Sequence, residues 1–216
     1  MIKNICFWLK NSRLFSLPMT LLSWLVIFVY SLKLGGNVLN GVLALVGISF
    51  AHLATNLFDD YVDYKNLPEN SQKCKCAYIK DGSATINDVL KVVVVYLVIA
   101  SGIGFVLFFR CGFPVIILAM IGGIIALIYA KLSQRGLSEL AVGTAFGPLL
   151  FEGVYFVMTG RFSWTVFVMS IAVVMFTIGL MYVHTLLDFE GDMCAHKKTL
   201  VCRIGNKNIA LKGVFV

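Results

Sequence analysis

The chain has 216 residues, of which 59% are hydrophobic and 13% are charged, and its net charge is +7. Its mean hydropathy is +0.89. About a quarter of the residues in a typical soluble domain are charged, so this composition excludes an ordinary soluble protein and indicates one surrounded mainly by lipid. The positive charge requires no nucleic-acid partner, because Lys and Arg accumulate in the inner loops of membrane proteins.

Long apolar stretches follow one another along the chain. A membrane-spanning helix needs about 20 predominantly apolar residues. Six stretches have roughly this length, and in chain order they cover residues 14–32, 39–58, 89–109, 113–129, 137–158 and 163–187. Only a tight turn fits between the third and the fourth. We therefore expect an all-α, polytopic transmembrane bundle with six complete spans, formed by a single domain over residues 1–216.

The two ends of the chain need separate interpretation. Lys3, Lys10 and Arg13 precede the first stretch, as in a secretory signal, but no small-residue cleavage site follows, so we expect a permanent first helix. A seventh apolar stretch begins near Ile209 and reaches Val216. That length is too short to cross a bilayer, so we expect only the start of a seventh span.

The distribution of Lys and Arg predicts the orientation in the membrane. With the N-terminus inside, only Lys33, Arg110 and Arg161 lie on the outer side, and the other fifteen of the 18 basic residues lie on the inner side. This asymmetry predicts a multi-pass protein of the cell membrane with a cytoplasmic N-terminus. It also places the ends of the second, fourth and sixth spans at the cytoplasmic surface.

Polar residues with helical spacing follow the second span. His52, Asn56, Asp60 and Asp63 are separated by four, four and three residues, which places them on one face of a helix, and Asp59 lies beside them. The simpler explanation is a solvated helix end, although acids at a helix C-terminus oppose the macrodipole. Several carboxylates close to hydrocarbon indicate instead that a cation offsets their repulsion.

A second polar stripe ends the sixth span on the same side of the membrane. His184, Asp188 and Asp192 are spaced by four residues, and His196 extends the series if the helix persists. Two groups of hard oxygen ligands at one surface suit Mg²⁺, which proteins typically hold with one or two carboxylates together with phosphate oxygens. The stripes therefore predict a site for a metal-bound diphosphate.

Basic residues stand near both stripes. Each can be a membrane anchor on the inner side, and together they can neutralise the charge of a diphosphate. They are Lys73, Lys75 and Lys80 after the first stripe, Lys131 and Arg135 between the fourth and fifth spans, and Lys197, Lys198 and Arg203 after the second stripe.

Two motifs carry a family resemblance. The sequence NLFDDYVD over residues 56–63 resembles the first aspartate-rich motif of the UbiA superfamily of membrane prenyltransferases, and DFEGD over residues 188–192, followed by KKTL, resembles the second. The stretch RGLSELAVG over residues 135–143, with FGP at 146–148, is similar to the branch that prenylates 1,4-dihydroxy-2-naphthoate in menaquinone biosynthesis.

The resemblance implies an activity and its ligands. Asn56, Asp59, Asp60, Asp63, Asp188 and Asp192 would hold Mg²⁺ against a polyprenyl diphosphate, with the last four aspartates most directly engaged in its ionisation. Lys75, Lys131, Arg135, Lys197 and Lys198 would neutralise the departing diphosphate. An aromatic acceptor would then attack the allylic carbocation, in a cavity to which we assign Tyr129, Glu152, Tyr155 and His184.

Glu152 leaves two alternatives open because a charge in the middle of a span is costly. It either faces the cavity and orients a hydroxyl of the acceptor, or is protonated and hydrogen-bonded to a neighbouring helix. The sequence also departs from the family pattern, with Leu67 in place of a further acid, with His184 and Leu187 where Asn and Arg are common, and with fewer than the usual nine spans.

Two other functions compete with prenyl transfer. A transporter would distribute its acids through the depth of the bilayer, whereas here only Glu152 lies deep. A truncated, inactive relative would bind a prenyl diphosphate without turning it over.

Overall fold

The computed structural model describes residues 5–66, 76–194 and 198–213, which form helices and turns without a β-strand. The first helices are α1 (Ile5–Asn11), the short η1 (Leu14–Ser16), α2 (Leu17–Lys33) and α3 (Val38–Asn66). They are followed by α5 (Ala77–Lys80), α6 (Ile86–Cys111) and α7 (Pro114–Gln134). The remaining helices are α8 (Ser138–Thr144), η2 (Ala145–Leu149), α9 (Leu150–Thr159), α10 (Trp164–Leu187), α11 (Phe189–Cys194), α12 (Leu200–Ile204) and α13 (Lys207–Lys212).

The expected membrane helices are present. Five helical segments in the described part of the chain are long and apolar enough to cross a bilayer, namely Leu14–Lys33, Val38–Lys65, Ile86–Cys111, Ser138–Thr159 and Trp164–Leu187. The fourth expected span corresponds to α7, which is apolar over the shorter stretch Pro114–Tyr129. The prediction of an all-helical integral membrane protein is therefore confirmed.

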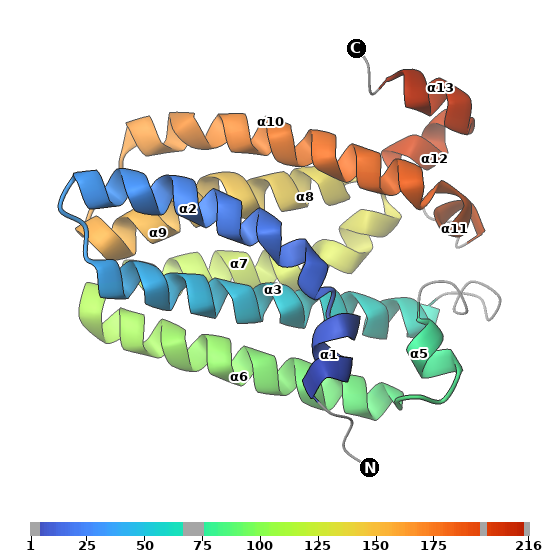
Figure 1. The fold of residues 1–216 in the computed structure, drawn as a ribbon, viewed down its shortest axis with the longest axis horizontal. Helices are drawn as coiled ribbons and strands as arrows, with labels where there is room; N and C mark the ends of the chain where they lie inside the picture. The colour runs from blue at the N-terminus through green and yellow to red at the C-terminus, as the bar shows by residue number, and fades with distance from the viewer. Residues whose placement is uncertain (1–4, 67–75, 195–197, 214–216) are drawn as a thin grey trace.

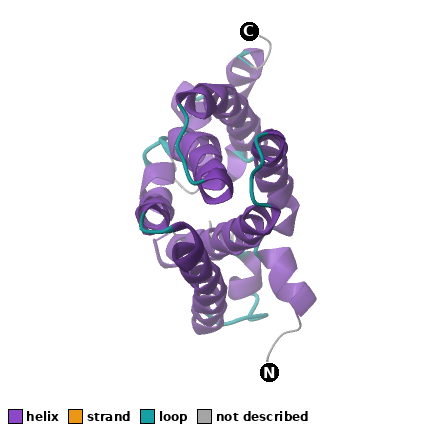
Figure 2. Cartoon of the chain, turned by 90° about the vertical axis from the view of Figure 1, so that its left-hand side faces the viewer, coloured by secondary structure: helices purple, strands orange, loops and turns teal. Residues whose placement is uncertain are grey.

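The long helices lie side by side in one bundle (Figure 1). Helix α3 packs along α6, α2 packs on α9, and α8 packs on α10. Figure 2 looks along the bundle and shows the long helices nearly end-on. Helices α3, α7 and α10 all end on the right of Figure 1, where α5 and α11 also lie. We call this the acidic end, because both aspartate-rich motifs are located there.

Local sequence explains where several helices begin and bend. Pro114 stands at the start of α7, where its missing N–H has no helical partner to lose. Thr85 and Asp88 form a reciprocal capping box at the start of α6. The span from α8 to α9 bends in η2, a π-helical segment where Gly147 leaves helical geometry and Pro148 interrupts the hydrogen bonds.

Close packing explains the choice of glycine at this bend. A Cβ atom on Gly147 would lie 2.5 Å from Cγ2 of Val174 on α10. The glycine therefore lets α10 approach the bend, and α10 packs along both α8 and η2. Through this contact α10, which leads to the second aspartate-rich motif, packs against the bent span that begins with α8.

Candidate functional site

The two acidic motifs lie at the same end of the bundle, as their sequence positions predict (Figure 1). We call Asp59, Asp60 and Asp63 the first acidic motif, and Asp188 and Asp192 the second. The first lies in the last turns of α3, which continues as a helix to Asn66. The second lies where α10 passes into α11.

The first acidic motif is buried and paired with a cation from the N-terminal segment. Asp59, Asp60 and Asp63 are only 5%, 3% and 1% exposed. Nη2 of Arg13 lies 2.6 Å from Oδ1 of Asp60 and 3.7 Å from Oδ2 of Asp59. Burial alone would lower the pKa of Arg13, but these two carboxylates outweigh it and hold the pKa above its ordinary value, so the guanidinium stays charged.

The polar stripe on α3 faces the same N-terminal segment. The amide of Asn56 donates to the carbonyl of Ser12 (3.0 Å) and to the hydroxyl of Ser16 (3.1 Å). The ring of His52 lies within hydrogen-bonding distance of Ser16 and of Thr20. Sequence reasoning placed this stripe on one helical face but did not predict that residues 12–20 cover it.

The segment after the first motif holds Asp60 from another side. The Tyr78 hydroxyl donates to Oδ2 of Asp60 (3.1 Å), and the buried Cys76 thiol donates to the Asp60 carbonyl (3.3 Å). Burial, followed by the Asp60 charge, raises the pKa of Tyr78 well above its ordinary value. The same two causes raise the pKa of Cys76 to about 12. Both groups are therefore protonated in this structure and act as hydrogen-bond donors to Asp60.

The second acidic motif is more open. Helix α10 ends at Leu187, and Asp188 is its C-terminal cap, half exposed and 3.8 Å from Nδ1 of His184. Asp192, in contrast, is 2% exposed. Its N–H still donates to the Asp188 carbonyl (2.8 Å) across the junction. Because α10 ends before Asp188, the Asp188 carboxylate is half exposed and the Asp192 carboxylate is buried. One uninterrupted helix would place both on the same face.

Hydrogen bonds from Arg203 and close backbone packing hold the segment that follows the second motif. Arg203 donates from Nε to the Lys198 carbonyl (3.2 Å) and from Nη2 to the Arg135 carbonyl. Gly136 has a φ of +70°, and a Cβ atom there would lie 2.2 Å from the Lys198 carbonyl oxygen. The turn between α7 and α8 therefore lies directly against residues 198–203.

This packing brings two of the predicted diphosphate-binding residues close together. Arg135 and Lys198 lie on the two segments that Arg203 joins, and both side chains are exposed, as is that of Lys131 near the end of α7. Lys75 and Lys197 fall outside the described residues.

Tyr129 near the end of α7 and Glu139 at the start of α8 also belong to the acidic end. Tyr129, half-buried on α7, lies close enough to Asp59, Arg13, Glu139 and Asp63 for their charges to act on its hydroxyl. Glu139 is buried in the first turn of α8. It stands in the stretch that resembles the naphthoate-prenylating branch, but the sequence did not single it out as a site residue. The feature that could have identified Glu139 is a carboxylate at the start of an apolar span.

Two other predicted cavity residues lie elsewhere. Oε2 of Glu152 accepts a hydrogen bond from the Ser163 N–H (3.2 Å), at the turn that leads into α10. The ring of Tyr155 packs against that of Tyr30 on α2, with 6.2 Å between the centroids. Both contacts lie toward the end of the bundle opposite the acidic end (Figure 1). Glu152 thus accepts a hydrogen bond from the start of a neighbouring helix, which is the contact that one of its two alternatives predicted.

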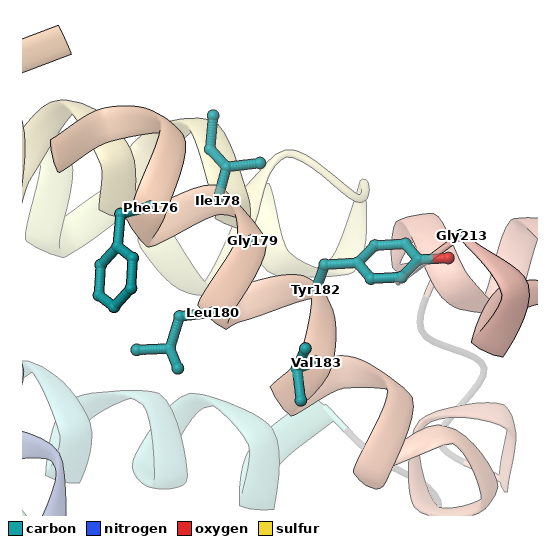
Figure 3. A pocket seen from close by; sticks show the side chains of 7 residues that line it. All are labelled: Phe176, Ile178, Gly179, Leu180, Tyr182, Val183 and Gly213. Carbon is teal, nitrogen blue, oxygen red and sulfur yellow. The ribbon is translucent and has the colours of Figure 1, made fainter. Parts of the chain in front are cut away.

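An apolar hollow along α10 does not resemble a diphosphate site. Phe176, Leu180, Tyr182 and Val183 line it together with Gly213 (Figure 3). Among the described residues no charged side chain lines it, and the Tyr182 hydroxyl donates a hydrogen bond to the Ala210 carbonyl (2.8 Å).

The donor set of the first motif suits a hard divalent cation. Oδ1 of Asp59 is buried and accepts no hydrogen bond from any residue that the structure describes. Carboxylate oxygens are the ligands that Mg²⁺ prefers. Within residues 5–66, 76–194 and 198–213, no three His, Cys, Asp or Glu side chains are grouped to hold a metal. Among the described residues, the Arg13 guanidinium forms an ion pair with Asp60 and Asp59 of the first motif.

Comparison with known proteins gives consistent results. The sequence profile of the UbiA prenyltransferase family matches residues 20–215. A 2-carboxy-1,4-naphthoquinone phytyltransferase from Synechocystis sp. is 31% identical over 77 residues, which are 36% of this chain and 25% of that protein. The matched segment is thus about a quarter of the length of this curated relative.

Solved structures share the fold. Two structures of a UbiA homologue from Archaeoglobus fulgidus, one bound to DMAPP and Mg²⁺ and the other to GPP and Mg²⁺, superpose with TM-scores of 0.73 and 0.75. They are 15% and 13% identical to this chain, and each alignment covers 96% of this chain and 72% of the other. At this level of identity the likeness establishes the helical architecture.

Proposed function

We propose that this chain, which belongs to the UbiA prenyltransferase family, transfers a prenyl group from an allylic diphosphate to an aromatic quinone precursor at its acidic end. The observation that carries the proposal is the position of the two acidic motifs at one end of the bundle, with exposed basic residues on the segments beside the second. The family resemblance inferred from the two motifs is confirmed by the matching profile.

Mg²⁺ is the proposed cofactor, held by Asp59, Asp60 and Asp63 with Asn56 on one side and by Asp188 and Asp192 on the other. When bound, it would supply Lewis acidity to the diphosphate oxygen that leaves. The buried oxygen of Asp59 that lacks a hydrogen-bond donor supports this assignment. The bound Mg²⁺ of the Archaeoglobus fulgidus homologue is consistent with it.

The side chains of this protein then have distinct tasks. Lys131, Arg135 and Lys198, with Lys75 and Lys197, neutralise the charge that accumulates on the diphosphate. The allylic C–O bond breaks and its electron pair leaves with the diphosphate. A ring carbon of the acceptor supplies the pair for the new C–C bond, and the ring loses its proton. The face of Tyr129 is suited to stabilise the allylic cation.

We infer a bicyclic naphthoate or naphthoquinone precursor as the acceptor, as in menaquinone biosynthesis. The phytyltransferase relative supports this choice through the name of its own substrate. We place the acidic end on the cytoplasmic side of the cell membrane, because fifteen of the 18 Lys and Arg residues fall on that side.

Diphosphate release tests the proposal. The purified chain in lipid nanodiscs, given geranyl diphosphate, 1,4-dihydroxy-2-naphthoate and Mg²⁺, should release diphosphate and form a prenylated naphthalene. Asp60→Asn and Asp188→Asn should each abolish both products. Asp88→Asn is the matched control, since Asp88 is an acid outside both motifs whose capping bonds to Thr85 an Asn can keep.

The outcomes separate the competing functions. Full activity in both motif variants would refute the metal assignment. A wild-type chain that binds Mg²⁺ and diphosphate without releasing product would be the inactive relative considered above.

A further inference from the structure

Glu139 is a buried carboxylate that belongs to neither acidic motif. It is 5% exposed and lies where α7 turns into α8, at the acidic end. Its Oε2 accepts a hydrogen bond from the Ser138 hydroxyl (3.0 Å). Its Oε1 is buried and accepts no hydrogen bond from any side chain or backbone group in the described chain. A buried carboxylate oxygen without a donor is costly, so this atom is suited to a donor that a ligand brings.

The free oxygen of Glu139 lies in the same part of the molecule as the first acidic motif. Helix α7, which carries Tyr129, packs against both α3 and α8. The charges of Asp59 and Asp63 from α3 and of Glu139 from α8 all act on the Tyr129 hydroxyl. Glu139 therefore lies near the region where the proposed function places the prenyl donor, but on α8 instead of α3.

Glu139 lies apart from the aspartates. It is in the first turn of α8, whereas the two aspartate-rich motifs lie at the end of α3 and at the junction of α10 with α11. A carboxylate that is separate from a metal cluster, buried and half satisfied is a strong acceptor for a neutral donor such as a phenolic hydroxyl. An electron-rich aromatic substrate carries such a hydroxyl.

We propose that Glu139 binds the aromatic acceptor by accepting a hydrogen bond from one of its ring hydroxyls. This inference rests on the proposed function, in which the acceptor is a hydroxylated naphthalene. The hydrogen bond orients the ring toward the donor site, and a carboxylate partner increases the electron density of a phenol. Glu139 thereby selects acceptors that have a hydroxyl at the matching ring position.

A second glutamate of the same span supplies the matched control. Glu152 lies thirteen residues further along the continuous segment Ser138–Thr159. Its carboxylate already accepts the Ser163 N–H, toward the opposite end of the bundle. Replacing it by Gln therefore removes the same charge from the same span without touching the acidic end.

The test measures acceptor binding directly, so that it does not depend on turnover. Equilibrium binding of 1,4-dihydroxy-2-naphthoate is measured with Mg²⁺ and inorganic pyrophosphate present, for the wild type, Glu139→Gln, Glu139→Asp and Glu152→Gln. Glu139→Gln should weaken naphthoate binding about tenfold, because a hydrogen bond to a charged carboxylate becomes a weaker one to a neutral amide oxygen. Glu139→Asp should recover part of the loss, and Glu152→Gln should bind like the wild type. The pyrophosphate affinity should be the same in all four proteins.

Three results would overturn the inference. They are unchanged naphthoate binding in Glu139→Gln, an equal loss in Glu152→Gln, and loss of pyrophosphate binding in Glu139→Gln, which would make Glu139 part of the metal site. Turnover of geranyl diphosphate, measured on the same samples, reports on the proposed function separately. Naphthoate binding that depends on Glu139 in a chain without turnover would refute prenyl transfer and support the role of Glu139.

Discussion

The two acidic motifs lie at the same end of the bundle but are held in different ways. Side chains hold the first motif, because Arg13 and Tyr78 grip the two carboxylate oxygens of Asp60. The segment after the second motif is held by the Arg203 side chain, which donates to two backbone carbonyls, and by the close approach of Gly136 to Lys198, while Asp188 stays half exposed. We infer that a ligand must exchange Arg13 for another cation at the first motif, whereas it can approach Asp188 without breaking a buried bond.

The largest effect is expected on the side of the second motif, from Gly136→Ala. The new Cβ would lie 2.2 Å from the Lys198 carbonyl oxygen, and φ is +70°. Strain and clash together should lower the free energy of unfolding by about 3 kcal/mol, measured by SDS titration in mixed micelles.

Gly205→Ala separates the two causes of that loss. Gly205 has a φ of +71° but no atom near its Cβ position, so this variant should lose only about 1 kcal/mol. Equal losses in the two variants would show that the contact with Lys198 is unimportant.

The next largest effect is expected at the first motif, from Arg13→Gln. The change leaves the buried Asp60 and Asp59 carboxylates without their cation, so the free energy of unfolding should fall by about 2 kcal/mol. The estimate is below the usual cost of breaking a buried pair because the Arg13 side chain is 30% exposed.

Mg²⁺ provides a second readout for the same variant. If the carboxylates take a divalent cation in place of Arg13, added Mg²⁺ should stabilise Arg13→Gln more than the wild type. Arg13→Lys, which keeps the charge, should fall between the two. Equal stabilisation of all three proteins by Mg²⁺ would argue against exchange of Arg13 for the metal.

Tyr78→Phe should have a smaller effect at the first motif. It removes one hydrogen bond to the Asp60 carboxylate and should cost about 1.5 kcal/mol in the same SDS titration. The pKa of Tyr78 is raised, so the folded state keeps the proton more firmly than the unfolded chain does. The contribution of this hydrogen bond should therefore be fully present below pH of about 10 and be lost only as the pH rises beyond it.

Tyr61→Phe is the control for that variant. The Tyr61 hydroxyl accepts a hydrogen bond at the surface from the ammonium of Lys65 (2.6 Å), its one hydrogen-bond partner among the described residues. Its removal should change the free energy of unfolding by less than about 0.5 kcal/mol. A loss as large as that of Tyr78→Phe would show that burial of the Asp60 contact adds nothing.

The smallest effect is expected from His184→Gln. The His184 and Asp188 side chains are both half exposed and 3.8 Å apart. An exposed pair of this kind should contribute less than about 0.5 kcal/mol. A loss matching that of Arg13→Gln would remove the contrast between the buried Asp60 and the half-exposed Asp188.

Hydropathy and charge were sufficient to predict most of the fold. The apolar stretches became the helices, and Thr85 with Asp88 and Pro114 mark helix starts by known local rules. The two motifs share one end because an even number of crossings separates them. These features depend on residues close in sequence, which is why the pattern alone could predict them.

The contacts that shape the site were not predictable in this way. Arg13 meets Asp60 across 47 positions, and Glu139 lies on α8, which packs against the same helix α7 as α3 does. The break at Asp188 replaces a continuous polar stripe with two carboxylates in different surroundings. Such contacts depend on how helices pack, and the spacing of residues within one helix carries no information about it.

The most direct test asks whether the two motifs hold one ligand. Binding of inorganic pyrophosphate in the presence of Mg²⁺ is measured for the wild type, Asp60→Asn, Asp188→Asn and the double variant, in a double-mutant cycle. If both motifs act on the same diphosphate, each single substitution should weaken binding strongly and the double variant should bind little worse than the weaker single one. Losses that simply multiply, or a dissociation constant unchanged by Asp188→Asn, would contradict a site shared by the two motifs.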